Sequence, residues 1–263
     1  MQQPQLLNVE VSERVARVTL NRPEVRNAFN SQLIEELRAT FEGIGNGSFG
    51  EVRAVILSGA GQSFCAGADV NWMRASLEFT HEQNVSDATY MSDMFEQINR
   101  CPVPVVCRIH GAALGGGVGL AAVCDIVVAA DDAVWAFSEA KLGIAPAVIS
   151  PYVLAKIGRS HARALFFTAE RFDSRRAEQI GLAHVVVAEE ALDSEVERLV
   201  REVKSSSGKA IAKAKELVGT VPALPPEQAR ELTVQTIAAL RVSPDGQEGL
   251  RAFLEKRKPE WAG

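Results

Sequence analysis

Short apolar segments alternate with helical patterns through much of the chain, and this alternation limits the fold more than any other feature. Apolar runs of strand length occur at residues 52–59, 102–111, 124–130 and 184–188. Longer segments lie between them, and the one over about 80–100 has the character of a helix. Strands that alternate with helices are typical of α/β architecture with right-handed crossovers. The sequence therefore predicts an α/β fold.

The N-terminal segment predicts a hairpin followed by a helix. Residues 6–20 contain two short alternating stretches around the sequence SER, which indicates a β-hairpin. Further along, Ser31 is a residue type that caps helices. The apolar face of the expected helix consists of Leu33, Ile34, Leu37, Phe41 and Ile44.

From about residue 189 the pattern becomes helical and remains so. Three amphipathic segments follow one another, and no internal repeat, low-complexity tract or long linker interrupts the chain. We expect residues 1–200 to form an α/β core and residues 201–263 to form a helical region. Such a region often packs against another subunit.

Charge and cysteine content exclude several functional classes. The net charge is −5 and the pI about 5.5, so a broad nucleic-acid surface is not expected. The four cysteines show no CxxC spacing and no histidine at metal spacing, which predicts reduced, mostly buried thiols and no metal site. The first residues lack the pattern of a secretory signal, and no apolar run reaches the roughly 18 residues of a membrane span. We therefore expect a cytoplasmic protein without a membrane partner.

A glycine run, LGGGVGL at residues 114–120, follows the second apolar strand. It lacks the Lys-Ser/Thr of a P-loop, and Leu120 occupies the place where a dinucleotide fingerprint needs its third glycine. The run precedes a small-residue helix at residues 120–123, and bare N–H groups at a helix N-terminus favour a negatively charged oxygen. The alternative is close helix packing with no ligand.

A second small-residue turn, FCAGADV at residues 64–70, follows the strand at 52–59. Small residues allow backbone N–H groups to approach a ligand closely. Two such turns, each following a buried strand, could converge on one oxygen and form a two-donor oxyanion hole.

Glu139 follows Trp135 and Phe137 in an apolar stretch. A carboxylate in such surroundings has a raised pKa and can carry protons during catalysis. The alternative is a surface glutamate that pairs with Lys141 or Arg108.

The other polar candidates have structural interpretations. Asp69 and Asp125 are expected to cap turns or helices. The basic segment at 253–261 is either a solvated helix end or a phosphate contact. The four histidines are scattered and none belongs to a nucleophile signature, which disfavours a catalytic triad; they are His81, His110, His161 and His184.

Taken in order, these motifs resemble the crotonase superfamily of enoyl-CoA hydratases and isomerases. The resemblance runs from Leu20 to Trp261, so it covers nearly the whole chain. It implies a spiral of repeated ββα units followed by C-terminal helices that build a trimer, often paired into a hexamer. The motifs that carry it are LNRPEVRNAFN, FCAGADV, HGAALGGGVGLAAVCDIVVAA, FSEAKLGIAPAVISPYVLAKIG and GLRAFLEKRKPEW.

The resemblance also assigns roles residue by residue. Ala68 and Gly116 would supply the two oxyanion-hole N–H groups, and Glu139 matches the second catalytic glutamate of the hydratases. Phe253 and Lys256 would reach CoA across a subunit interface. The remaining residues implied at the substrate and CoA site are Val25, Arg26, Ala28, Ala66, Asp69, Val70 and Gly119.

One position departs from the pattern of two-glutamate hydratases, because Gly119 stands where their first glutamate would be. A single acid/base is enough for Δ3,Δ2-enoyl-CoA isomerisation, which is one alternative. The combination of GGxxGL with SEAKLGIAPAVISPYV most resembles bacterial hydratases of carboxylated, branched enoyl-CoAs. Their substrates are 3-methylglutaconyl-CoA in leucine breakdown and γ-carboxygeranoyl-CoA in acyclic terpene breakdown.

We therefore expect a hydratase that adds water to a branched or carboxylated 2-enoyl-CoA. Arg108 or another basic residue would pair with a substrate carboxylate. No separate cofactor is expected, because coenzyme A is part of the substrate. The expected assembly is a homotrimer or homohexamer, without nucleic acid. An alternative of another class is a non-catalytic member that only binds CoA or a partner.

Overall fold

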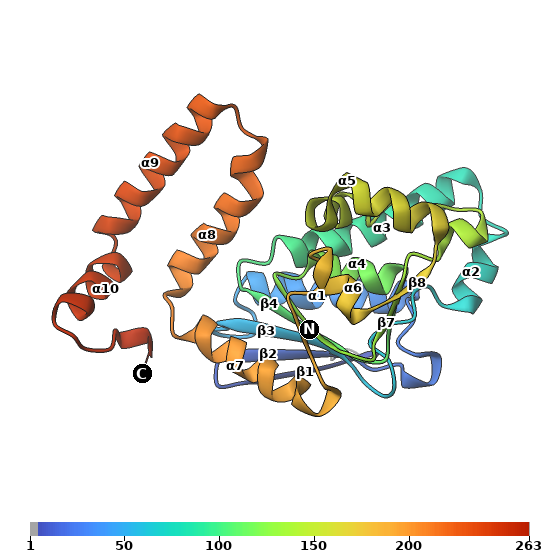
Figure 1. Cartoon of the computed structure of the whole chain (residues 1–263), viewed down its shortest axis with the longest axis horizontal. Helices are drawn as coiled ribbons and strands as arrows, with labels where there is room; N and C mark the ends of the chain where they lie inside the picture. Colours follow the sequence, from blue (N-terminus) through green and yellow to red (C-terminus); the bar gives the residue numbers. More distant parts are fainter. Residues whose placement is uncertain (1–4, 263) are drawn as a thin grey trace.

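The computed structural model describes residues 5–262, and these residues build one large sheet covered by helices (Figure 1). The sheet has six strands in the order β1-β2-β3-β4-β6-β9. The β1–β2 pair is antiparallel and every later pair is parallel, as expected for helical crossovers. The strands are β1 (Leu7–Ser12), β2 (Val15–Leu20), β3 (Ala54–Gly59), β4 (Val105–Ile109), β6 (Ile126–Ala130) and β9 (Val185–Val187).

The predicted hairpin and the first helix are both present. β1 and β2 meet through a two-residue turn in which Glu13 and Arg14 have φ values of 50° and 61°. In α1 (Ser31–Gly45) the five predicted apolar residues are all buried. The predicted cap is wrong by one residue, because the side chain of Asn30 accepts the Leu33 N–H and Ser31 is the first helical residue.

A second, three-stranded sheet lies beside the large one and was not predicted. It consists of β5 (Ala112–Leu114), β7 (Val134–Ala136) and β8 (Arg171–Asp173). Trp135 of β7 is fully buried and donates its indole N–H to Ser174 Oγ at 3.1 Å. β5 stands between β4 and the glycine run, so the glycines follow this short strand directly.

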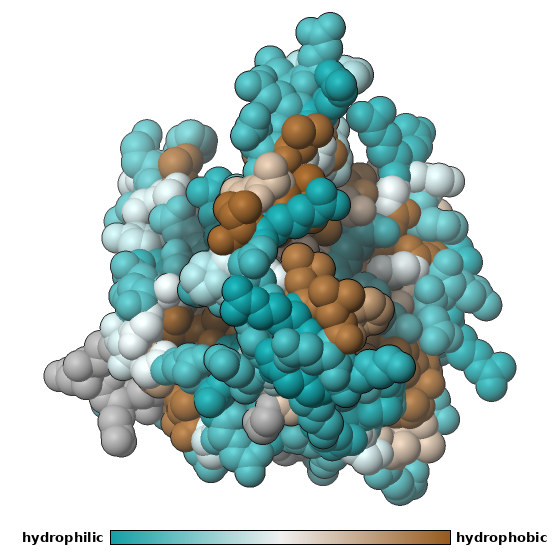
Figure 2. Space-filling view, turned by 90° about the vertical axis from the view of Figure 1, so that its left-hand side faces the viewer, coloured by the Kyte–Doolittle hydropathy of each residue, from teal (hydrophilic) through white to brown (hydrophobic). Residues whose placement is uncertain are grey.

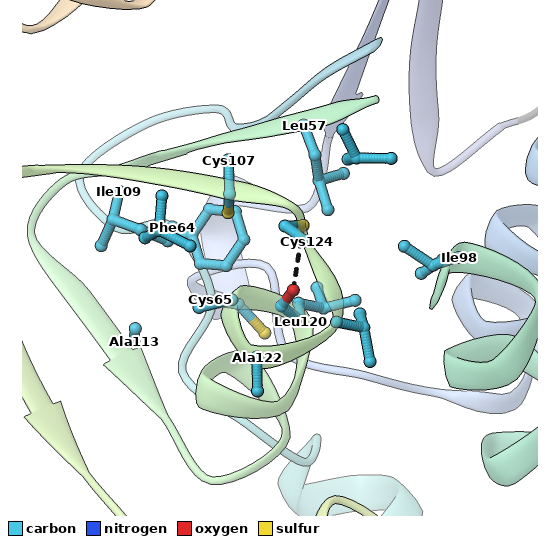
Figure 3. Packing of buried hydrophobic residues seen from close by; sticks show 14 of the residues in the cluster. Leu57, Phe64, Cys65, Ile98, Cys107, Ile109, Ala113, Leu120, Ala122 and Cys124 are labelled. Carbon is cyan, nitrogen blue, oxygen red and sulfur yellow. Dashed lines mark hydrogen bonds between the residues drawn. The ribbon is translucent and has the colours of Figure 1, made fainter. Parts of the chain in front are cut away.

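Helix α4 (Gly116–Val123) lies in the core and packs there mainly through small side chains. It begins at Gly116 and not at Leu120, so the sequence analysis placed its start too late. Figure 3 shows Leu120 and Ala122 of this helix among Leu57, Phe64 and Cys107, with the Cys124 thiol donating to the Leu120 carbonyl at 3.0 Å. All four cysteines are free and buried, as predicted.

The other helices cover the sheet or extend from it. Those that pack around the core are α2 (Val70–Ser76), α3 (His81–Asn99), α5 (Ser150–Thr168), α6 (Ser174–Gln179) and α7 (Leu192–Lys204). The last three are α8 (Gly208–Thr220), α9 (Pro226–Val242) and α10 (Pro244–Leu254). Within residues 5–262 no helix is long and apolar enough to cross a membrane.

Figure 1 shows α8 and α9 extending side by side away from the sheet, with α10 and the C-terminus beyond them. The boundary expected at residue 200 falls inside α7, which packs on β3, β4 and β6. On this side of the molecule apolar side chains interrupt the hydrophilic surface (Figure 2). The most exposed large apolar side chains of α8, α9 and α10 are those of Val218, Val242, Phe253 and Leu254.

Candidate active site

A cavity of about 360 Å³ opens between the start of α4 and the helices α2 and α3. Its wall is completed by the segment from Glu139 to Ile149, which connects β7 to α5. The lining residues are Phe29, Ala66, Gly67, Ala68, Trp72, Met73, Ser76, Asn84, Asp87, Ala88, Met91, Gly115, Gly116, Ser138, Glu139, Leu142, Ile144, Ala145, Pro146, Ala147, Val148 and Ile149.

A larger groove of about 800 Å³ lies between α1 and α3, and both of its arginines are paired with glutamates. Arg38 bonds Glu35 and Glu42, and Arg100 bonds Glu96. The smaller cavity, in contrast, contains a carboxylate oxygen and backbone donors that have no hydrogen-bond partner among the described residues. It is therefore the better candidate for chemistry.

Two backbone N–H groups reach this cavity from different loops. Phe29 bridges the 64–70 turn by donating to the Gly67 carbonyl (2.7 Å) and accepting from the Asp69 N–H (2.8 Å), which leaves Ala68 between the two bonds. Gly116 is the first residue of α4, where an N–H has no partner inside the helix. Within residues 5–262 neither the Ala68 nor the Gly116 N–H has a hydrogen-bond acceptor.

Glycine is needed where these loops approach each other. Gly67 has φ +92°, and a Cβ there would lie 2.9 Å from the Leu114 carbonyl oxygen. A Cβ on Gly116 would lie 2.7 Å from the Phe29 ring. The glycine run at 114–120 and the 64–70 turn are therefore closely packed, and this packing brings both N–H groups to the same cavity.

Hydrogen bonds from the 22–30 loop hold the 64–70 turn in position. Arg22 donates to Asp69 Oδ2 at 2.8 Å, and both side chains are largely buried. Burial alone would raise the pKa of Asp69, but the bonds from Arg22 and from the Asn71 N–H lower it overall. Asn27 is fully buried, donates to the Ala60 and Ser63 carbonyls at 2.8 Å and accepts from the Arg22 N–H. These bonds fix the position of Ala68.

Asp69 has the capping role expected of it, whereas Asp125 is structural but caps neither a turn nor a helix. Asp69 also caps α2 by accepting the Asn71 N–H at 2.8 Å. Asp125 accepts the Val105 N–H at 2.8 Å and pairs with Lys215 at 2.7 Å, so it joins β4 to α8.

Glu139 begins the short 3-10 helix η2 (Glu139–Leu142) and is half-buried. Its carboxylate lies over the start of α4, because a Cβ on Gly115 would be 3.3 Å from Glu139 Oε1. Glu139 Oε2 is buried without a hydrogen-bond partner among the described residues. Burial raises the pKa of Glu139. The alternative of a surface pair is wrong for Arg108, which pairs with Asp193 at 2.5 Å and contacts His110.

Gly119 does not line the cavity, although its neighbours one turn earlier do. A Cβ at this position would lie 2.3 Å from Ile149 Cγ2 and 2.9 Å from Phe95 Cζ. The fold therefore has no room for any side chain at residue 119.

The expected CoA residues fall into two groups in this chain. Ala66 lines the cavity, and its N–H bonds the Arg26 carbonyl at 2.9 Å, which places the 25–28 segment against the 66–70 turn. Phe253 and Lys256 lie at the far end of the molecule, as the distance between α2 and α10 in Figure 1 makes plain. Phe253 lines a different hollow beside α8 and α9 and is 81% exposed.

One face of α3 contributes cavity residues that the sequence analysis did not assign. Asn84, Asp87, Ala88 and Met91 follow helical spacing and lie along one side of the helix. Asp87 is half-buried, and burial raises its pKa. None of the lining residues in the described chain is Lys or Arg. The same residues include no cluster of His, Cys, Asp and Glu placed to hold a metal.

Two free N–H donors beside a carboxylate with raised pKa define an enzyme site that can stabilise an oxyanion and move protons. The family described as enoyl-CoA hydratase/isomerase matches residues 10–263, so this chain belongs to that family. The probable enoyl-CoA hydratase of Bacillus subtilis is 31% identical over 263 residues, which cover 98% of each protein.

Solved structures show the same fold. An enoyl-CoA hydratase from Shewanella pealeana superposes with a TM-score of 0.94 at 35% identity, over 99% of this chain and 97% of that one. AtuE of Pseudomonas aeruginosa gives 0.95 at 35% identity, over 98% and 100%. The predicted crotonase-type α/β fold with C-terminal helices is confirmed.

Proposed function

We propose that this protein is a hydratase that adds water to a branched or carboxylated 2-enoyl-CoA, such as 3-methylglutaconyl-CoA. The observation that carries the proposal is the convergence of the free Ala68 and Gly116 N–H groups with the unpartnered Glu139 carboxylate in one cavity. The thioester oxygen would lie between the two donors. Glu139 would then face the double bond.

The reaction balances with one carboxylate. Glu139 takes a proton from water as the oxygen bonds to C3, and the π electrons of the double bond move to the thioester oxygen. The resulting enolate accepts hydrogen bonds from Ala68 and Gly116. The proton on Glu139 then passes to C2, and the carbonyl reforms.

The two oxyanion donors and the single acid/base are each strong enough to account for this chemistry. A positioned oxyanion donor contributes about 2.7–4 kcal/mol to transition-state stabilisation. A positioned acid/base contributes a factor of roughly 10²–10⁴ in rate, most effectively when its pKa lies near the working pH. Burial moves the pKa of Glu139 in that direction.

The cavity wall favours the branched part of this substrate class. Trp72, Met73, Met91, Leu142 and Ile144 supply apolar surface for an acyl branch. A substrate carboxylate in this cavity would lie near Asp87, and none of the lining residues in the described part of the chain is a Lys or Arg that could pair with it. A carboxylated substrate would therefore require a basic residue from a neighbouring subunit, and Arg108, held by Asp193, is not its partner.

We place the CoA moiety along Val25, Arg26, Ala28, Ala66, Asp69 and Val70. Asp69 would contribute by holding the turn in position, because its carboxylate is occupied by Arg22 and Asn71 and its N–H donates to the Phe29 carbonyl. Phe253 and Lys256 would reach CoA from a neighbouring subunit of a homotrimer or homohexamer. No separate cofactor is required.

Isomerisation between Δ3- and Δ2-enoyl-CoA is the second candidate. Gly119 favours it, since no side chain fits there and α4 therefore cannot supply a second carboxylate at this position beside Glu139. One carboxylate can move a proton between C4 and C2.

Absorbance at the conjugated enoyl-thioester band separates the two reactions. The panel is crotonyl-, 3-methylcrotonyl-, 3-methylglutaconyl- and 3-enoyl-CoA. A hydratase bleaches the band of a branched 2-enoyl-CoA, whereas an isomerase creates it from 3-enoyl-CoA. Loss of the proposed function would be marked by no bleaching of any 2-enoyl-CoA.

A further inference from the structure

Position 119 faces the cavity side of α4. Residues three and four apart share one face of an α-helix, and their side chains lean toward its N-terminus. Gly119 donates its N–H to the Gly115 carbonyl at 3.2 Å, and both Gly115 and Gly116 line the cavity. A side chain at residue 119 would therefore project toward the part of α4 that lines the cavity.

Ile149 fills the space that such a side chain would need. It is the residue directly before α5, at the N-cap position, is 3% exposed and lines the cavity. Its Cγ2 lies 2.3 Å from the ideal Cβ position of Gly119, and this methyl is attached directly to Cβ, so it cannot swing aside without a change of rotamer.

Phe95 bounds the same space, because its Cζ lies 2.9 Å from the ideal Cβ position of Gly119. Its ring is fully buried and packs edge-on against Phe29, with centroids 6.2 Å apart and planes at 88°. The ring also contacts Tyr152, at 6.2 Å between centroids. Neither Ile149 nor Phe95 can therefore give way to a side chain at residue 119.

We propose that Ile149 determines specificity by taking the place of a second carboxylate and presenting an apolar wall to the substituent at C3. This inference rests on the proposed function, because it concerns the acyl chain. A methyl branch at C3 buries its surface against Ile149, whereas an unbranched chain leaves that space empty. Residues 119 and 149 compete for the same space, so the size of one side chain limits the size of the other. We call this pair the steric unit.

The kinetic test compares 3-methylcrotonyl-CoA with crotonyl-CoA. Ile149→Ala should lower the ratio of their kcat/KM values, branched over unbranched, by about tenfold or more, which is the usual effect of lost apolar contacts in a substrate pocket. Ile149→Val should give an intermediate ratio. Ile157→Ala is the matched control, because Ile157 is buried in α5 without lining the cavity, so it should lower Tm without changing the ratio.

The steric test is a double-mutant cycle on thermal stability. Gly119→Ala should lower Tm strongly, and the double variant with Ile149→Ala should lose less than the two single losses added together, because the 2.3 Å contact with Ile149 Cγ2 is removed while the one with Phe95 Cζ remains. If Gly119→Ala does not fold alone, folding of the double variant carries the same information. A Gly119→Ala protein as stable as wild type would contradict the steric unit.

The outcomes distinguish this inference from the proposed function. If wild type hydrates no 2-enoyl-CoA of the panel, the proposed function fails and the specificity assignment fails with it. If wild type is active and Ile149→Ala leaves the ratio unchanged, only the assignment to Ile149 is overturned.

Discussion

At the scale of single residues, Glu139 is held where an ionised carboxylate is unfavourable. One of its oxygens is buried without a partner, and burial raises its pKa. A buried polar atom without a hydrogen bond lowers stability, and active sites commonly accept such a loss. The fold tolerates this carboxylate because the surrounding core is extensive.

Glu139→Gln should therefore stabilise the protein at neutral pH by about 1 kcal/mol, a figure reduced for the partial exposure of the side chain. The raised pKa means that the folded state binds the proton more tightly than the unfolded chain does. Its contribution to stability is fully present below the ordinary pKa of 4.5 and is lost as pH rises through the folded-state pKa.

Thermal unfolding at several pH values checks this. The advantage of Glu139→Gln should shrink as pH falls and vanish below about 4.5, where both states carry the proton. Glu170→Gln, at an exposed residue, is the control and should show no such trend. A destabilised Glu139→Gln protein at neutral pH would refute this description of the site.

At the scale of elements, the site depends on how two loops are tied together. Arg22 bonds Asp69 and the Ala28 carbonyl, so it joins the 22–30 loop to the N-terminus of α2. The Ala68 N–H lies directly beside this junction. Stability and oxyanion binding should therefore both depend on Arg22.

Arg22→Ala should cost about 3 kcal/mol of unfolding free energy, because it leaves a buried carboxylate unpaired. It should also lower kcat, since Ala68 loses its support. Arg38→Ala, which breaks two surface pairs, should cost no more than about 1 kcal/mol. Chemical denaturation of both variants provides the comparison, and equal losses would argue against a special role for Arg22.

Strong local patterns made many elements predictable from the sequence. The hairpin and the apolar face of α1 are set by neighbouring residues, and so is the series of parallel strands. The strands β5, β7 and β8 were missed because each has three residues and none has the run of β-branched residues that revealed the equally short β9. Period-two alternation cannot be recognised over such a length.

For the site, the sequence pointed to Ala68, Gly116 and Glu139, which the structure brings to one cavity. It could not indicate which face of α3 would line that cavity, because the helix has polar residues on several sides. The contact between Gly119 and Ile149 also could not be predicted from the sequence. Those residues lie thirty positions apart, and only the packing of α4 against α5 joins them.

At the scale of the whole molecule, α8 to α10 leave apolar side chains exposed in a single chain. Phe253 and Leu254 are 81% and 77% exposed, far from the cavity of their own chain. Such a surface is typical of subunit contacts. We expect these helices to deliver Phe253 and Lys256 to a neighbouring subunit's CoA.

Complementation tests this arrangement. Glu139→Gln and Lys256→Glu proteins, each weakly active alone, should regain activity when they are denatured together and refolded. About a quarter of the sites in a statistical mixture would combine an intact Glu139 with an intact neighbouring Lys256. Activity that stays at the mean of the two single variants would mean that Lys256 serves its own chain or no site.

The central claim is that Glu139 delivers water to C3 of a 2-enoyl-CoA. Its most direct test is mass spectrometry of the product formed from 3-methylcrotonyl-CoA in ¹⁸O-labelled water, with wild type and Glu139→Gln. We predict one ¹⁸O atom in the 3-hydroxyacyl product of wild type and a rate lower by a factor of roughly 10²–10⁴ in the variant. Equal rates of ¹⁸O incorporation by the two proteins would contradict the account.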